Sequence, residues 1–239
     1  MLSTLSFLLF ASCAQTKDVQ ALEAKVVALE EKMAALEKRA PAGHASSAEE
    51  EAANAIMKLA TEAIKVNDYT TAKAKLEELT KSHSATKAGK AADRMYKEVG
   101  LIGTDAKPIV VDKWFQGKGD YADAPVTMMV FWEVWCPHCK KEMPSLALKE
   151  ADLKKKGVQV LGFTKVTKSA TDEKVLEFIK ENNIKYPIAK EKDASLSEGF
   201  NVSGIPAAAL VKGGKVIWRG HPGRLDDATL DQLIAGTPG

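Results

Sequence analysis

Residues 131–144 read FWEVWCPHCKKEMP and contain the most informative motif of the chain. They continue an apolar run, Val126–Phe131, that predicts a buried strand, and a helix is expected to begin after Cys136. Two cysteines separated by two residues at a strand-to-helix junction are typical of a dithiol redox centre. Unpaired N–H groups and the macrodipole at the helix N-terminus favour a thiolate at Cys136. Pro137 suits the first helical turn, where its missing N–H costs no hydrogen bond.

The composition of the 239-residue chain limits the possible classes of protein. Its 34 basic and 32 acidic side chains leave a net charge of only +2. This balance argues against a nucleic-acid partner, because duplex binding needs a concentrated basic face. Three cysteines are too few for a disulfide-stapled small domain. Covalent haem would need a histidine where Lys140 stands, and structural zinc would need a second ligand pair, so neither is expected.

The N-terminus predicts export. Residues 1–12 are interpreted as a signal peptide, because the apolar stretch 1–10 is shorter than the roughly 20 residues that span a membrane. Small residues directly before Cys13 resemble a bacterial lipoprotein signal, which implies lipid attachment at Cys13 in an anchor region 13–17. The residue after that cysteine is not acidic, which favours the outer membrane. No Lys or Arg precedes the apolar stretch, so an ordinary cleaved signal with a chance cysteine stays open.

Residues 18–40 carry a heptad pattern that predicts a parallel coiled coil. The apolar positions are Val19, Leu22, Val26, Leu29, Met33 and Leu36. Every e position is Glu and every g position is basic, so parallel pairing brings opposite charges together. We expect self-association through residues 18–39 as a dimer or trimer, with the lipid anchors on the same side. A single amphipathic helix docked on its own domain is the alternative.

The next part of the chain predicts a linker and then helices. Residues 41–48 contain Pro, Gly and Ser and predict a flexible linker. Residues 49–100 carry three amphipathic segments, with turns at Asn67-Asp68 and around His83. This segment loosely resembles one and a half tetratricopeptide units, without a full tandem repeat. A small helical spacer and a peptide-binding module both remain open.

Between residues 104 and 239 strands alternate with helices, which indicates a parallel or mixed sheet. Strands are expected at 126–131, 158–163, 207–211 and 215–218, and helices at 174–182 and 226–234. The last two strands should form a hairpin, because Gly213 and Gly214 between them suit positive φ.

Three motifs in this region resemble a known family. They are Trp135-Cys136-x-x-Cys139 with Phe131-Trp132 before it, Lys140-Lys141-Glu142-x-Pro144 and Val202-x-Gly204-Ile205-Pro206. From about Ile109 onward the chain resembles thioredoxin-fold proteins of the TlpA/ResA type. The resemblance implies disulfide exchange with protein thiols outside the cytoplasm, a membrane redox partner and no cofactor. The expected architecture is an α/β thioredoxin-like domain preceded by a coiled-coil helix and a small all-α, tetratricopeptide-like segment.

The same resemblance implies roles for individual residues. Cys136 would be the attacking thiolate and Cys139 the resolving thiol. Pro206 matches the cis-proline that faces the disulfide, and the backbone at Ile205 would pair with an extended substrate segment beside Trp135. An ordinary turn proline is the alternative for Pro206.

His138 bears on the direction of electron transfer. Cys-Pro-His-Cys is the centre of the strongly oxidising DsbA-type enzymes, whereas the TlpA/ResA group is often reducing. A histidine near the sulfur of Cys136 can donate a hydrogen bond or a charge to the thiolate, and a stabilised reduced form makes the disulfide more oxidising. Oxidation or isomerisation is therefore favoured. A ResA-like reductase for cytochrome c maturation and a non-enzymatic envelope adaptor with a redox-sensing dithiol are the alternatives.

Two glutamates are candidates for proton transfer. Glu142 lies three residues after Cys139, and a glutamate at this place in the ResA-like group lies near the active site; an exposed acid paired with a lysine is an equal alternative. Val130 occupies the strand position where thioredoxins bear a buried acid, so a proton acceptor must come from elsewhere. Glu133 is a second candidate, although it matches no functional position of the family.

Overall fold

The computed structural model describes residues 25–28, 32 and 45–236, and the chain divides into two compact units, Met1–Ser47 and Ala48–Gly239. Residues 25–28 and Lys32 are helical, and Val26 is about half exposed. The signal peptide, Cys13 and most of the predicted coiled coil lie outside the described residues. Self-association through residues 18–39 therefore stays a prediction.

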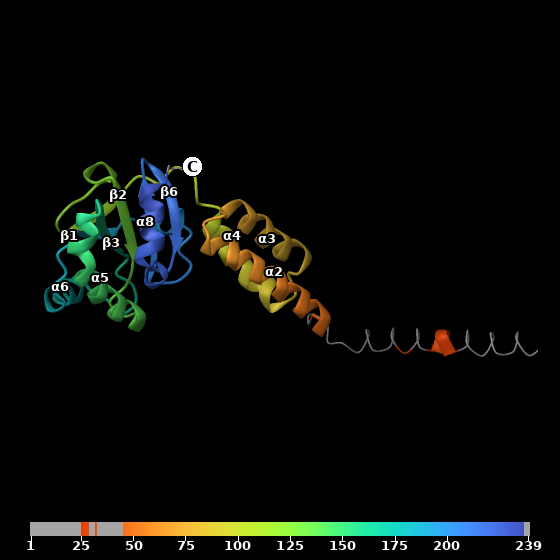
Figure 1. Cartoon of the computed structure of the whole chain (residues 1–239). Helices are drawn as coiled ribbons and strands as arrows, with labels where there is room; N and C mark the ends of the chain where they lie inside the picture. Colours follow the sequence, from red (N-terminus) through yellow and green to blue (C-terminus); the bar gives the residue numbers. More distant parts are fainter. Residues whose placement is uncertain (1–24, 29–31, 33–44, 237–239) are drawn as a thin grey trace, which may run out of the picture. The chain divides into compact units, whose positions relative to one another are not determined.

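The second unit begins with three helices, α2 (Ser47–Lys65), α3 (Tyr69–Ser82) and α4 (Lys87–Val99) (Figure 1). Helix α2 starts inside residues 41–48, which the sequence assigns to a linker. Side chains of Asp68 and Thr86 accept hydrogen bonds from the first turns of α3 and α4, which explains where these helices begin. Gly89 is required by close packing, because a Cβ there would lie 2.0 Å from the carbonyl oxygen of His83.

These helices bury a core made mostly of small residues. Its buried members are Ala53, Ala60, Ala63, Ala72, Leu76, Leu79, Ala88, Ala92 and Val99. Alanines let helices approach closely, so three short helices are enough to enclose this core. The expectation of three helices over residues 49–100 is confirmed. Their resemblance to tetratricopeptide units stays a prediction.

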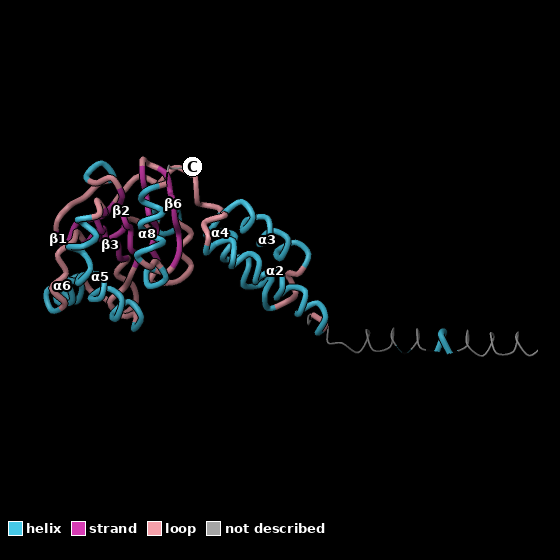
Figure 2. Tube along the Cα trace, in the orientation of Figure 1, coloured by secondary structure: helices cyan, strands magenta, loops and turns pink. Residues whose placement is uncertain are grey.

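The rest of the unit is a mixed six-stranded sheet with the order β1-β4-β3-β2-β5-β6. Strands β1, β2, β3 and β6 of this sheet are labelled in Figure 2. The strands are β1 (Val111–Gln116), β2 (Val126–Phe131), β3 (Val158–Thr164), β4 (Ile188–Glu191), β5 (Ala207–Lys212) and β6 (Lys215–Gly220). The helices are α5 (Pro137–Lys155), α6 (Asp172–Glu181), α7 (Ser195–Gly199) and α8 (Asp227–Ala235), with short 3-10 helices η1 (Tyr121–Asp123) and η2 (Pro222–Arg224). Strands β2, β3 and β4 run parallel, and β1, β5 and β6 pair antiparallel.

Both faces of the central strand β2 are buried, because its side chains alternate between two cores. Met128 and Val130 face the core that α5, α6 and α8 cover, while Met129 and Phe131 face the core that contains Leu196 of α7. An uninterrupted apolar run is what a strand covered on both faces requires. The expected α/β domain is confirmed. The four expected strands and the helices expected at 174–182 and 226–234 are present within a few residues of their expected bounds, and a helix begins after Cys136 as expected.

The sequence did not indicate strands β1 and β4, helix α7 or the two 3-10 helices. Both missed strands carry charged side chains, and the pairing of β1 with β4 contains two register shifts.

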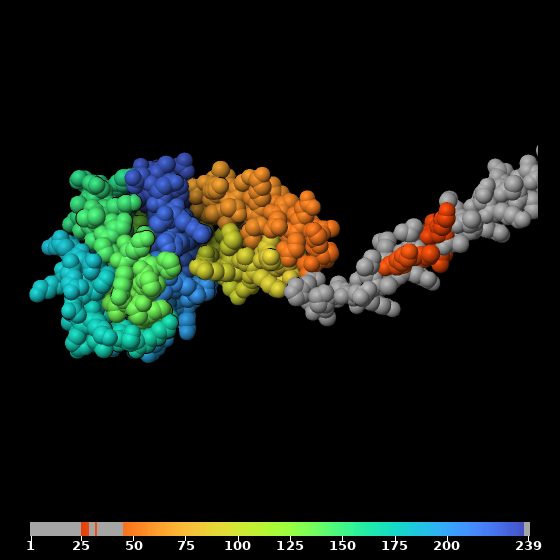
Figure 3. Space-filling model, turned by 90° about the horizontal axis from the view of Figure 1, so that it is seen from below, coloured from red at the N-terminus to blue at the C-terminus, as the bar shows by residue number. Residues whose placement is uncertain are grey.

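The helical segment contacts the sheet domain within this unit. Helix α4 lies against β6 (Figure 3), and the side-chain amide of Asn201 donates to the carbonyl oxygen of Lys97 at 2.9 Å. The buried guanidinium of Arg219 donates to the carbonyl oxygen of Phe200 at 2.8 Å and lies 3.9 Å from the Glu98 carboxylate. These bonds tie α4 to the segment that precedes β5.

Candidate functional site: a dithiol at the N-terminus of α5

Cys136 is the N-cap residue of α5, with extended backbone angles (φ −83°, ψ 118°). Strand β2 ends at Phe131, a short turn follows, and Pro137 begins the helix. The sulfur therefore lies at the end of the helix where unpaired N–H groups and the helix dipole stabilise negative charge. The Cys136 thiol also lies 3.6 Å from the carbonyl oxygen of Ile205, to which it can donate. The residue is 4 % exposed, so only a small part of it reaches the surface.

Cys139 lies in the first turn of α5 and is completely buried. Burial raises the pKa of the Cys139 thiol far above its usual range, and a hydrogen bond with Cys136 raises it further. The negative charge of Glu133 acts in the same direction, while a backbone hydrogen bond of Glu133 opposes it. Both cysteines are free thiols in this structure. The pair is therefore asymmetric, because Cys136 is the helix N-cap and is slightly exposed, whereas Cys139 is completely buried and held as a thiol.

The loop before β5 completes the site from a distant part of the sequence. The Ile205–Pro206 peptide bond is cis, as the sequence led us to expect, and Pro206 is buried. Strand β5 pairs antiparallel with β2 so that Ala207 lies opposite Phe131. This register places the start of β5 beside the end of β2, and so brings Ile205 to Cys136.

Trp135 forms another side of the site. Its indole is half-buried, and its Nε1–H donates to the hydroxyl of Thr167 at 3.3 Å. The ammonium of Lys168 lies 3.4 Å from the centre of the Trp135 ring, in a cation–π contact. The sequence analysis missed both Thr167 and Lys168. Their signal was their place directly after the strand 158–164, whose carboxyl end lies at the same edge of the sheet as that of β2.

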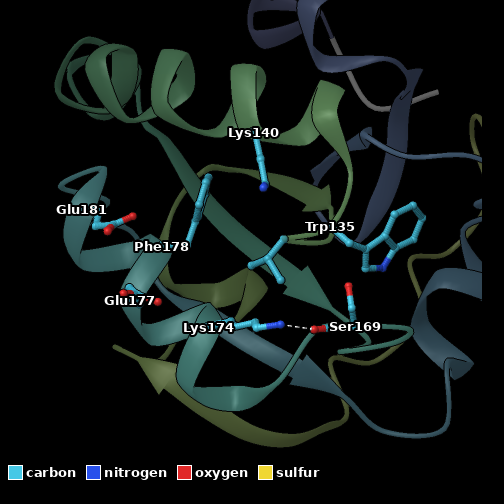
Figure 4. A pocket seen from close by; sticks show the side chains of 8 residues that line it. Trp135, Lys140, Ser169, Lys174, Glu177, Phe178 and Glu181 are labelled. Carbon is cyan, nitrogen blue, oxygen red and sulfur yellow. Dashed lines mark hydrogen bonds between the residues drawn. The ribbon is translucent and has the colours of Figure 1, made fainter.

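A cavity of about 310 Å³ adjoins Trp135 on the side of α6 (Figure 4). Lys140 and Lys174 lie around it together with Glu177 and Glu181, and the Lys174 ammonium donates to the carbonyl oxygen of Ser169 at 2.7 Å. Charges of both signs therefore surround the cavity, so the lining favours neither an anionic nor a cationic ligand.

Glu133 is the most buried carboxylate near the dithiol, with only 2 % of the residue exposed. Its Oε1 accepts from the hydroxyl of Thr167 at 3.0 Å and from the Thr167 N–H at 3.2 Å. Its Oε2 accepts from the hydroxyl of Thr164 at 3.2 Å. A buried carboxylate needs such donors to offset its lost hydration. Val130, at the place of the buried acid of thioredoxins, packs in the core beneath α5.

The two other polar candidates lie differently. His138 is exposed on the first turn of α5, two residues after Cys136. Glu142 is half-buried, and a Cβ on Gly223 would come within 3.1 Å of its carboxylate. Its negative charge also contributes to the raised pKa of Tyr186, after burial and the charge of Glu150. No hydrogen bond in the described part of the chain joins Glu142 to either cysteine.

Two further observations concern residues 25–28, 32 and 45–236. No group of three or more His, Cys, Asp or Glu side chains in these ranges could hold a metal ion. None of the helices within them is both long and apolar enough to cross a membrane.

Known proteins share this fold and this region of sequence. Residues 117–219 match the AhpC/TSA family. Over 106 residues the chain is 33 % identical to the thiol-disulfide oxidoreductase ResA of Bacillus thuringiensis subsp. konkukian (strain 97-27), a match that covers 44 % of this chain but only 56 % of that protein. Over 131 residues it is 30 % identical to the thiol-disulfide oxidoreductase ResA of Bacillus anthracis, covering 51 % of this chain and 70 % of that protein.

A solved structure supports the fold. The solution structure of a thioredoxin-like protein in the oxidised form aligns with a TM-score of 0.50 and 19 % identity, covering 56 % of this chain and 97 % of that one. The domain that carries the dithiol thus has the thioredoxin fold. With the close cysteine pair and the ResA relatives, it follows that the chain belongs to the ResA-like family of thioredoxin-fold thiol-disulfide oxidoreductases.

Proposed function

We propose that this protein is an extracytoplasmic protein disulfide oxidoreductase in which Cys136 and Cys139 exchange disulfides with protein substrates. The observation that carries the proposal is the asymmetry of the two sulfurs. Cys136 lies at a helix N-terminus that favours its thiolate, whereas Cys139 is buried with a raised pKa. Cys136 is therefore the sulfur that meets substrates, and Cys139 is the one that resolves the mixed disulfide.

In the oxidising direction a substrate thiolate attacks the sulfur of Cys136. The bond between Cys136 and Cys139 breaks, and the Cys139 thiolate takes up a proton because its pKa is raised. A second substrate thiolate then attacks the substrate sulfur of the mixed disulfide, and Cys136 leaves as a thiolate. The substrate loses two electrons and the enzyme pair gains them. A membrane redox partner that accepts two electrons would restore the disulfide.

The substrate would bind between Trp135 and the loop that ends in Pro206. The carbonyl of Ile205 lies next to the sulfur of Cys136, so an extended substrate segment that pairs with this backbone would present its own sulfur to Cys136. Backbone pairing is independent of side chains, which suits exchange with several protein thiols.

His138 supports the oxidising or isomerising direction. An exposed histidine two residues after Cys136 can donate a hydrogen bond or a charge to the Cys136 thiolate, which stabilises the reduced form. We expect a reduction potential nearer the value of about −120 mV found for DsbA than the value of about −270 mV found for thioredoxin. A His138→Ala variant should move toward the lower value. A wild-type potential near −270 mV would instead support a reductase like that expected for cytochrome c maturation.

A trapping experiment tests the proposal directly. Cys139→Ser should accumulate a mixed disulfide with a scrambled, disulfide-containing protein substrate, because the Cys136 thiolate attacks the substrate disulfide and the resolving thiol is gone. Cys136→Ser should trap nothing and should lose exchange activity. Equal biological activity of the double Cys136→Ser/Cys139→Ser protein would contradict an enzymatic role and favour an envelope adaptor.

The proposed location and assembly rest on the sequence. The lipoprotein-like signal supports lipid attachment at Cys13, and the heptads of residues 18–39 support parallel self-association in front of the catalytic domain. Cys13→Ser should release the protein from membrane fractions. Continued fractionation of that variant with membranes would contradict the anchor.

A further inference from the structure

A chain of hydrogen bonds connects a buried carboxylate to the indole next to Cys136. Glu133 accepts from both the backbone N–H and the hydroxyl of Thr167, and the same hydroxyl accepts from the Nε1–H of Trp135. The Thr167 hydroxyl thus has one donor bond and one acceptor bond, both used within the site. The bond to Glu133 orients the Thr167 hydroxyl, and the hydroxyl in turn orients the indole of Trp135.

The loop that carries Thr167 is held in an unfavourable conformation. Val166 and Lys168, on either side of Thr167, both have φ of 56°, in the left-handed region. A β-branched residue such as Val166 is rare there, and such a conformation persists only where surrounding contacts hold it. Here the hydrogen bonds of Glu133 with Thr164 and Thr167 hold the loop. The same loop holds the Lys168 ammonium over the Trp135 ring.

We propose that Glu133 is a positioning residue for disulfide exchange. Through Thr167 it holds the loop of residues 164–168 against Trp135, so that the indole forms a fixed wall beside Cys136 on which protein substrates dock. The inference rests on the proposed function and adds to it the group that orients the substrate site. The Glu133 carboxylate bonds the two threonines and not the sulfurs, and only the backbone of Glu133 hydrogen-bonds Cys139.

This role predicts a selective defect. Small dithiols reach the sulfur of Cys136 without touching the indole, so their exchange should not depend on the orientation of Trp135. A protein substrate must pack against that wall, so the KM for a protein disulfide should depend on the orientation of Trp135. A change that frees Trp135 should therefore separate the two classes of substrate, which a general loss of stability would not do.

The experiment uses the full-length protein with Thr167→Val, Thr167→Ser and Glu133→Gln. Val keeps the size of Thr167 but removes the hydroxyl, whereas Ser keeps the hydroxyl. Thr104→Val is the matched control, because Thr104 is another exposed loop threonine whose hydroxyl bonds only a local carbonyl, at the far end of the sheet. Two reactions are measured: reduction of insulin disulfides by the reduced protein, and reduction of the oxidised protein by dithiothreitol. The indole N–H signal of Trp135 is followed by ¹⁵N NMR after assignment with Trp135→Phe.

We expect Thr167→Val and Glu133→Gln to raise the KM for insulin about tenfold and to shift the Trp135 N–H signal. For Thr167→Val, which leaves the Glu133 charge in place, the rate with dithiothreitol should stay within about twofold of wild type. Thr167→Ser and Thr104→Val should resemble wild type with both substrates. An unchanged ratio of the insulin and dithiothreitol rates, or an unmoved Trp135 signal in Thr167→Val, would overturn the inference. A wild-type protein that exchanges with neither substrate would instead overturn the proposed function.

Discussion

The buried thiol of Cys139 should make the stability of the reduced protein fall at alkaline pH. Burial, followed by the hydrogen bond with Cys136, raises the pKa of Cys139 in the folded state. In the unfolded chain a cysteine has a pKa of about 8.5. Above that pH the unfolded state loses a proton that the folded state keeps, so stability that is fully present below about pH 8.5 is lost as pH rises. One proton corresponds to about 1.4 kcal/mol per pH unit, which gives a loss of about 1.4 kcal/mol between pH 7 and 9.5.

The assay compares two variants that both lack the Cys136 thiol, so that only Cys139 differs. The free energy of unfolding is measured in urea, with reductant, for Cys136→Ala and for Cys136→Ala/Cys139→Ala at pH 7, 8.5 and 9.5. The first variant should lose about 1.4 kcal/mol more than the second over this range. Buried phenols such as that of Tyr186 titrate above this range in the unfolded chain and are common to both variants. Parallel pH profiles would refute the argument that Cys139 is held as a thiol.

Three further predictions concern other parts of the chain. Burial raises the pKa of Glu191, so its charge destabilises the fold above about pH 4.3; Glu191→Gln should be more stable than wild type at pH 7, and urea denaturation should show the difference vanish near pH 4. Gly162→Ala would place a Cβ 2.4 Å from Cδ1 of Ile188 and should cost about 1–3 kcal/mol in thermal unfolding; an unchanged melting temperature would contradict this packing. Leu29→Asp, at a d position of the heptads, should yield a monomer by light scattering, whereas an unchanged mass would exclude the coil as the assembly element.

The sequence predicts the centre of the sheet well, because a central strand is recognised from its own residues alone. A strand buried on both faces needs an uninterrupted apolar run, and Val126–Phe131 shows one. The positive φ angles of Gly213 and Gly214 likewise follow from the tight hairpin they close. The edge strand Val111–Gln116 and its neighbour Ile188–Glu191 are not visible in this way. They are short, carry Lys, Asp and Glu, and gain their structure by pairing with each other across a long stretch of sequence.

The same distinction applies to the site. The cysteines and Pro137 predict a helix N-terminus from their own spacing, and the structure places them there. The environment of Glu133 could not be predicted, because the donors that let this carboxylate be buried come from the end of β3 and the loop after it. Nothing in the stretch around Glu133 indicates that Thr167 will reach it. The pairing of β2 with β3 determines that contact.

Strand directions explain why three separate segments meet at Cys136. Strands β2 and β3 run parallel, so the segments after their carboxyl ends, with Cys136 and Thr167, emerge at one edge of the sheet. Strand β5 runs antiparallel to β2, so the residue before its start, Ile205, lies at the same edge. The reacting sulfurs belong to the rigid helix α5, whereas the two flanking walls belong to loops. Substitutions in residues 164–168 should therefore change which proteins dock more than they change the reduction potential of the pair, because that potential depends chiefly on the sulfurs and the helix that holds them.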